Sequence, residues 1–219
     1  MFILSAYYCF PEFITDNKEH KQNYRSENDD REGQKMTPQE LKNSILQLAI
    51  QGKLVEQRPE EQPVNLSSIN NRQTDDYDFE LPEKWALAHL ESITDAIPSK
   101  QYQILESQVL KEGNFAVISQ SKEYSIGFSN ADEKVYHHDE PVIIFGDHTT
   151  IIKFIDFDFV VGADGVKIFS PKSILLPEYF FYVMQYLCID LDKVGGYSRH
   201  YKYIRTNQYL SLPLPSKSA

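Results

Sequence analysis

The sequence predicts an α+β fold, in which a mixed, β-rich domain contains a buried helix and follows an amphipathic helix. Fourteen Tyr and thirteen Phe in 219 residues favour β structure, because flat rings fit a pleated surface. Residues 177–191 form a pattern that is apolar on nearly every side, which predicts a buried helix. Short runs rich in β-branched or aromatic residues, each bounded by Gly, Asp or Asn, predict strands at 115–119, 141–145, 150–155, 157–161 and 166–169.

The amphipathic helix begins with a capping box. The hydroxyl of Thr37 can accept from the backbone N–H of Glu40, whose side chain can reach back, and Pro38 suits the first helical position. Gly52 suits the end of the helix. The apolar stripe is broad, so two interpretations stay open: the helix packs on the domain's own core, or it forms a seam with another helix or chain. The candidate partner-interface residues are Leu41, Ile45, Leu48 and Ala49.

Composition divides the chain into segments. Seven carboxylates and four basic residues between Glu12 and Gln34 predict a poorly ordered leader, after which Met36 is a candidate second start site. Only two cysteines are present, which is typical of a reducing cytoplasm, and no membrane span or export signal is expected. The expected segments are a leader at 1–36, a helix at 37–55, a polar linker at 56–80, the main domain at 81–215 and a tail at 216–219.

A basic island stands out in a chain whose net charge is −10. The stretch from Lys193 to Gln208 holds four Lys or Arg residues and no carboxylate, and tyrosines are interleaved with the charges. Cations gain free energy by replacing counterions along a phosphate backbone, and rings between them can stack on bases. This pattern indicates an anionic ligand. The alternative is a basic turn whose tyrosines cover a core.

Histidines raise a second possibility, a small β-rich metalloenzyme that uses His137, His138 or His148. Adjacent histidines on a strand point to opposite faces, which is poor geometry for joint ligation, and no HxH or HExxH spacing occurs. The sequence also lacks a Ser-His-Asp motif, a P-loop and the Asn/Asp-Pro-Pro-Tyr motif of adenine methyltransferases. We therefore expect no bound metal, no cofactor and no catalytic residues.

Several motifs, taken in order, resemble one known family. They are LKNSILQLAIQGKLV at 41–55, LPEKW at 81–85, IFGDHT at 144–149, FVVGADGV at 159–166, GYSRHYK at 196–202 and LPLP at 212–215. Their order and spacing resemble the DNA specificity subunits of type I restriction-modification systems. The resemblance implies a target recognition domain at 81–215, similar to the small DNA-reading domain of adenine-N6 methyltransferases, and a spacer-type helix at 37–55.

The resemblance also implies partners. Such a subunit is not an enzyme: it reads double-stranded DNA, holds the modification (methyltransferase) subunits, which use S-adenosylmethionine, and guides the restriction subunits. This chain departs from the pattern, because it holds one recognition domain instead of two, stops where a long spacer helix normally follows, and carries an unmatched leader. It therefore resembles a truncated or half-subunit form that reads one half-site. A second copy of the chain is a further candidate partner, and a non-functional fragment is the alternative.

The DNA-binding residues follow from the resemblance together with the basic island. Arg199 can pair bidentately with guanine, whereas lysines suit phosphates; the alternative for Arg199 is a structural salt bridge. For His148 and Thr149 the alternative is turn chemistry, and for Lys122 and Gln101 it is a solvated loop. The expected set is Arg199, Lys202, Tyr197, Ser198, His200, Tyr201, Lys193, Arg205, His148, Thr149, Lys122 and Gln101.

Overall fold

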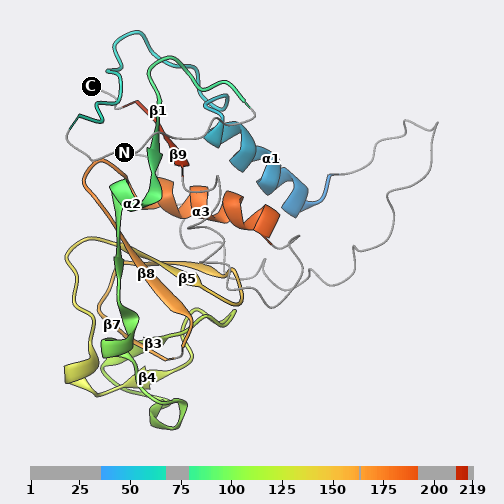
Figure 1. The fold of residues 1–219 in the computed structure, drawn as a ribbon. Coiled ribbons are helices and arrows are strands. Elements are labelled where there is room, and N and C mark those ends of the chain that lie inside the picture. The colour runs from blue at the N-terminus through green and yellow to red at the C-terminus, as the bar shows by residue number, and fades with distance from the viewer. Residues whose placement is uncertain (1–35, 68–78, 163, 192–210, 217–219) are drawn as a thin grey trace. The chain divides into compact units, whose positions relative to one another are not determined.

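The computed structural model describes residues 36–67, 79–162, 164–191 and 211–216. The chain divides into two units, Met1–Met36 and Thr37–Ala219, and every described helix and strand belongs to the second. That unit combines helices with three small sheets, which confirms the α+β class (Figure 1). Apart from Met36, the expected leader lies outside the described residues.

Helix α1 (Pro38–Ile50) begins at the predicted capping box. The backbone N–H of Glu40 donates to the Thr37 hydroxyl at 3.3 Å, and the backbone N–H of Thr37 donates to the Glu40 carboxylate at 2.8 Å. The helix ends at Ile50, as the predicted stop at Gly52 requires, and residues 51–55 of the expected segment are not helical. Gly52 follows with φ +66°, and a Cβ there would lie 2.3 Å from Cγ of Pro82. Only glycine fits this position, because it lacks a Cβ and adopts positive φ without strain.

A four-stranded antiparallel sheet forms the centre of the unit, in the order β2 (Thr94–Ile97), β8 (Val166–Pro171), β5 (Val142–Gly146) and β6 (Ile152–Ile155). Every residue of β5 is buried. Because successive side chains point to opposite faces, Ile143 and Phe145 join one hydrophobic cluster while Val142 and Ile144 join another. Both faces of the sheet are therefore covered.

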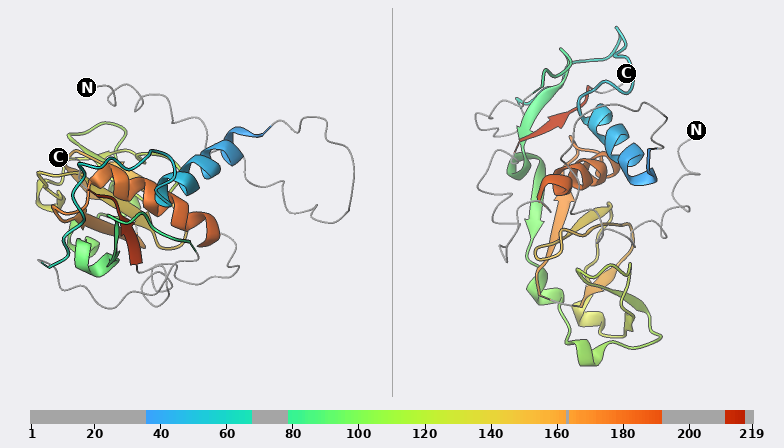
Figure 2. Two further views of the ribbon diagram at one scale, coloured as in Figure 1. Left: turned by 90° about the horizontal axis from the view of Figure 1, so that it is seen from above. Right: turned by 90° about the vertical axis from the view of Figure 1, so that its right-hand side faces the viewer.

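Helix α3 (Pro177–Leu191) covers one face of this sheet, with Phe180 and Met184 fully buried. Helix α1 lies beside α3 in all views, and Ile50 joins the same cluster (Figures 1 and 2). The prediction of a buried helix at 177–191 is confirmed. Tyr182 is 43% exposed, because the sheet and α1 cover only part of the helix surface.

A three-stranded sheet packs on the other face, in the order β4 (Phe128–Ser129), β3 (Phe115–Ile118) and β7 (Phe159–Val161). Ile118, Phe159 and Val161 pack against residues of the four-stranded sheet. Strands β3 and β7 are parallel neighbours, so their carboxyl ends meet at one edge. That edge positions the loops of the candidate site.

The remaining elements complete the unit. Strand β1 (Ala86–His89) pairs with β9 (Ser211–Leu214), and α2 (Leu90–Ile93) leads into β2. Three short 3-10 turns are η1 (Ser99–Tyr102), η2 (Glu106–Gln108) and η3 (Asp132–Lys134). The five predicted strands are confirmed as β3, β5, β6, β7 and β8, whereas β1, β2, β4 and β9 were not predicted. None of the helices in the described part of the chain combines the length and apolar character that crossing a bilayer requires.

Candidate nucleic-acid interface

Three loops meet where β3, β5 and β7 end. They are residues 119–127, residues 147–151, and residue 162 with residues 164–165, and we call them the loop cluster. The parallel pairing of β3 with β7 brings the first and third loops to the same edge. The second joins them because Gly146 pairs with Val166, and the N–H of Asp147 donates to the carbonyl of Gly165 at 2.8 Å.

Gln120 links all three loops. Its amide nitrogen donates to the carbonyl of Asp164 at 2.8 Å, and its amide oxygen accepts from the backbone N–H of His148 at 3.1 Å. Its backbone carbonyl accepts from the hydroxyl of Thr149 at 2.7 Å. One residue of the first loop therefore fixes both the second and the third.

Two predicted DNA-binding residues, His148 and Thr149, lie side by side in the turn between β5 and β6, and both are exposed. The hydroxyl of Thr149 is already engaged as a donor to Gln120, and His148 is an exposed residue. Asp147 before them is buried, with its carboxylate 3.9 Å from the Lys167 ammonium. The turn is held by these contacts, and the exposed residues His148 and Thr149 lie in it.

Two further predicted residues lie on adjoining segments. Lys122 is exposed in the first loop. Gln101 is exposed in η1, whose Ser99 hydroxyl donates to the carbonyl of Val166 at 2.7 Å, directly after the third loop. Just beyond η1, Gln103 donates to the carboxylate of Asp164 at 3.1 Å. The structure thus brings four predicted residues to the loop cluster or its immediate border.

The remaining eight predicted DNA-binding residues lie outside the described residues. This set holds the basic island, and its members are Arg199, Lys202, Tyr197, Ser198, His200, Tyr201, Lys193 and Arg205.

Two of the three histidines of the metalloenzyme alternative, His137 and His138, have other partners. Nδ1 of His137 lies 2.6 Å from the carboxylate of Asp158, and this hydrogen bond lowers the pKa of that carboxyl group. The two ring nitrogens of His138 lie 2.7 Å and 2.9 Å from the carbonyl oxygens of Glu140 and Phe157. Within the described ranges, no group of three or more His, Cys, Asp or Glu side chains could hold a metal ion.

Sequence reasoning missed Gln120 and Lys153. Lys153 is 4% exposed on β6, and it sends its ammonium to the first loop of the cluster. A lysine inside the apolar strand Ile152–Ile155 was the available signal, since a buried charge must find partners. Gln120 gave no signal, because a glutamine in a polar loop is common.

Comparison with known proteins shows that this α+β domain is similar to a specificity subunit of a type I restriction-modification system, which confirms the resemblance seen in the motifs. The particular curated relative is the specificity subunit of the Escherichia coli type I restriction enzyme EcoR124I/EcoR124II. It is 27% identical over 104 residues, which are 45% of this chain and 25% of that subunit. The chain therefore spans about a quarter of the length of this relative. No family model matches the chain.

Solved structures of the same kind of subunit are also similar. A chain from a type I restriction-modification complex gives a TM-score of 0.46 at 17% identity, over 81% of this chain and 43% of its own length. The HsdS subunit from Thermoanaerobacter tengcongensis gives 0.42 at 17% identity, over 81% and 42%. The S subunit from M. genitalium gives 0.44 at 14% identity, over 61% and 35%.

Proposed function

We propose that the chain is a sequence-specific DNA-binding subunit that reads one half-site for a type I restriction-modification complex. It carries no catalytic residue; it acts in the cytoplasm and directs methyltransferase and restriction subunits to their target. The observation that carries the proposal is the convergence of three tied loops that expose Lys122 and His148, in a chain similar to a specificity subunit. Rigid presentation favours base readout, because bidentate contacts require fixed donor positions.

Within this proposal, the residues have different roles. The ammonium of Lys122 suits a phosphate, and Gln101 and His148 suit base edges. In the basic island, Arg199 reads guanine or binds phosphate, while Lys202 and its neighbours bind the backbone. Because phosphate contacts release counterions, affinity should fall steeply with salt concentration.

The proposed partner interface is the outer face of α1. Leu41, Ile45 and Leu48 are 50%, 43% and 42% exposed, and Ala49 is half-buried. The buried side chains of the helix are Leu46 and Ile50, so its contact with the unit leaves this apolar stripe uncovered among the described residues. We propose that it docks against a methyltransferase subunit or a second copy of the chain.

The test is selection of bound DNA. The full chain is co-expressed with the modification subunit, and duplexes with a randomised core are selected on the purified complex. An enriched half-site supports the proposal. Failure of the chain to co-purify, or selection of no common sequence, contradicts it.

Point variants sharpen the same test. Arg199→Ala and Lys122→Met should weaken binding to the selected duplex. Lys122→Met should also reduce the slope of log affinity against log salt by about 1. Lys84→Ala is the control, because Lys84 donates to the carbonyls of Arg58 and Pro59, away from the loop cluster. Equal affinity of all three variants would contradict the assignment of these residues.

A further inference from the structure

Lys153 occupies an unusual position for a lysine. It lies in the middle of β6, is 4% exposed, and shares its strand face with the fully buried Ile155. Its ammonium donates to the carbonyls of Ser119 at 2.7 Å, Glu123 at 2.6 Å and Tyr124 at 3.3 Å. An ammonium has three N–H donors, and here each has a carbonyl acceptor.

These contacts fold the first loop of the cluster around a cation. The loop leaves β3 at Ser119 and returns to it at Ser125, whose hydroxyl lies 3.2 Å from the carbonyl of Val117. Tyr124 adds a hydrogen bond from its hydroxyl to the carbonyl of Phe154, the residue after the lysine, at 2.6 Å. Carbonyl oxygens that point inward at one place need a positive partner there, because an unpartnered buried acceptor costs about 1–3 kcal/mol.

The carbonyls that the Lys153 ammonium holds lie next to the residues of the candidate site. Ser119 directly precedes Gln120, which ties the other two loops, and Glu123 directly follows Lys122, which faces solvent. The buried cation therefore fixes both sides of the segment 120–122. Lys153 itself is too buried to reach a phosphate.

We infer that Lys153 is a positioning residue for DNA recognition: it holds the segment 120–122 in the conformation that presents Lys122 to the duplex, without touching nucleic acid. The inference rests on the proposed function. It adds a specificity-supporting residue from a core strand, outside the loops that meet the ligand.

The main test uses the full chain and the variant Lys153→Met, which keeps the length of the side chain and removes the N–H donors. Hydrogen exchange should show lost amide protection in residues 120–126 and retained protection in β5. Affinity for the selected duplex should fall at least about tenfold, the equivalent of one lost charged hydrogen bond. The control is Lys84→Met, which removes a lysine that also holds two carbonyls.

A double-mutant comparison separates positioning from direct contact. If Lys153 acts through Lys122, Lys153→Met should lower affinity much less in a Lys122→Met background than in the wild type. An equal loss in both backgrounds would mean that the Lys153 ammonium acts independently of Lys122, and the positioning role would be wrong. Lost loop protection with unchanged affinity would also overturn it.

A pH profile keeps the inference testable if the methionine variant does not fold. Burial lowers the pKa of Lys153 to about 8, opposed by the carboxylate of Glu123. When the loop opens, the amine returns to water and binds a proton more readily than in the closed loop, so protection of 120–126 relative to β5 should rise between about pH 8 and 10. Tyr124 stays protonated in this window, because burial raises its pKa to about 12. A flat profile overturns the inference.

The two proposals fail in different ways. If the wild-type chain, with its modification subunit, binds no duplex, the proposed function is wrong and the positioning role falls with it, whatever the exchange data show. If the wild type binds and the lysine variant binds equally well, only the positioning role is wrong.

Discussion

Substitution of Gln120 by alanine tests whether the loop cluster is one cooperative surface. The change removes the side-chain bonds to the carbonyl of Asp164 and to the N–H of His148, at 2.8 Å and 3.1 Å, and leaves the backbone bond from Thr149 in place. At about 1 kcal/mol for each net hydrogen bond, local opening of the turn should become easier by about 2 kcal/mol. This corresponds to roughly a 30-fold loss of amide protection.

The assay is hydrogen exchange read at the amide of His148 and at the amide of Asp147, which donates to Gly165. Amides of β5 serve as the internal reference for global unfolding. Gln108→Ala is the matched control: its side chain also accepts from a backbone N–H, that of Leu105 at 2.8 Å, but within η2. Unchanged exchange at His148 in Gln120→Ala, with β5 intact, would refute the reasoning that this residue joins the loops.

Three further predictions concern the rest of the unit. Thr37→Ala should lower the free energy of unfolding, followed in urea, by about 1 kcal/mol, because it removes the cap shared with Glu40; no change would mean that the cap is dispensable. The hydrogen bond from His137 lowers the pKa of Asp158, so this pair stabilises the fold above the ordinary aspartate pKa and is lost as pH falls below it. At neutral pH the free energy of unfolding of the wild type, measured in urea, should exceed that of Asp158→Asn by less than about 1 kcal/mol, and the two values should converge in acid. A difference that grows as the pH falls would contradict the stabilising role of the ionised carboxylate. Ile45→Glu should change stability by no more than about 0.5 kcal/mol, since the side chain is 43% exposed, yet abolish co-purification with a partner subunit; retained co-purification would remove α1 from the interface.

Local patterns predicted much of the fold. The capping box at Thr37 and the apolar runs of β5 and β8 are signals contained in a few consecutive residues, and the structure has them where expected. Strand β9 was not predicted, because Pro213 lies inside it. A proline is tolerated there because β9 pairs with β1 in a two-stranded sheet, where one side of the strand needs no ladder hydrogen bond.

The candidate site was less predictable, since its contacts join distant residues. The turn of His148 and Thr149 was recognised from its composition, but Gln120 acts on it across 28 positions in the chain. Lys153 likewise acts 34 positions away on Ser119. Neither spacing appears as a periodic pattern in the sequence, because packing of the sheet that holds β3 and β7 on the sheet that holds β5 and β6 creates these neighbours.

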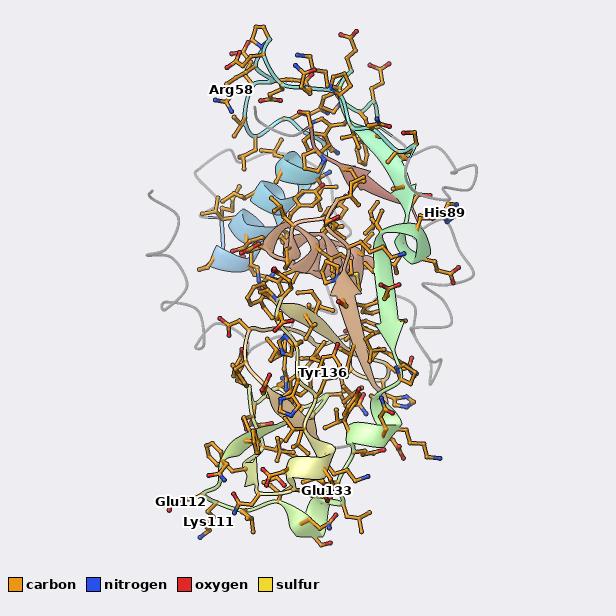
Figure 3. The ribbon with its side chains drawn as sticks, turned by 90° about the vertical axis from the view of Figure 1, so that its left-hand side faces the viewer. Arg58, His89, Lys111, Glu112, Glu133 and Tyr136 are labelled. Carbon is orange, nitrogen blue, oxygen red and sulfur yellow. The ribbon has the colours of Figure 1, made fainter. Side chains whose placement is uncertain are left out.

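The contact between Gly52 and Pro82 has an architectural consequence. Pro82 lies against the Cα of Gly52, and the ring of Trp85 lies 3.3 Å from the place that a Cβ would take. Arg58, on the segment between Gly52 and Pro82, lies at the end of the unit opposite Lys111 and Glu112 (Figure 3). The direction of α1 is consequently set by the contact of Gly52 with Pro82 and Trp85, and not by the residues between them. A change in the number of residues between Gly52 and Pro82 should therefore leave the direction of α1 unchanged, as long as both residues keep their contact.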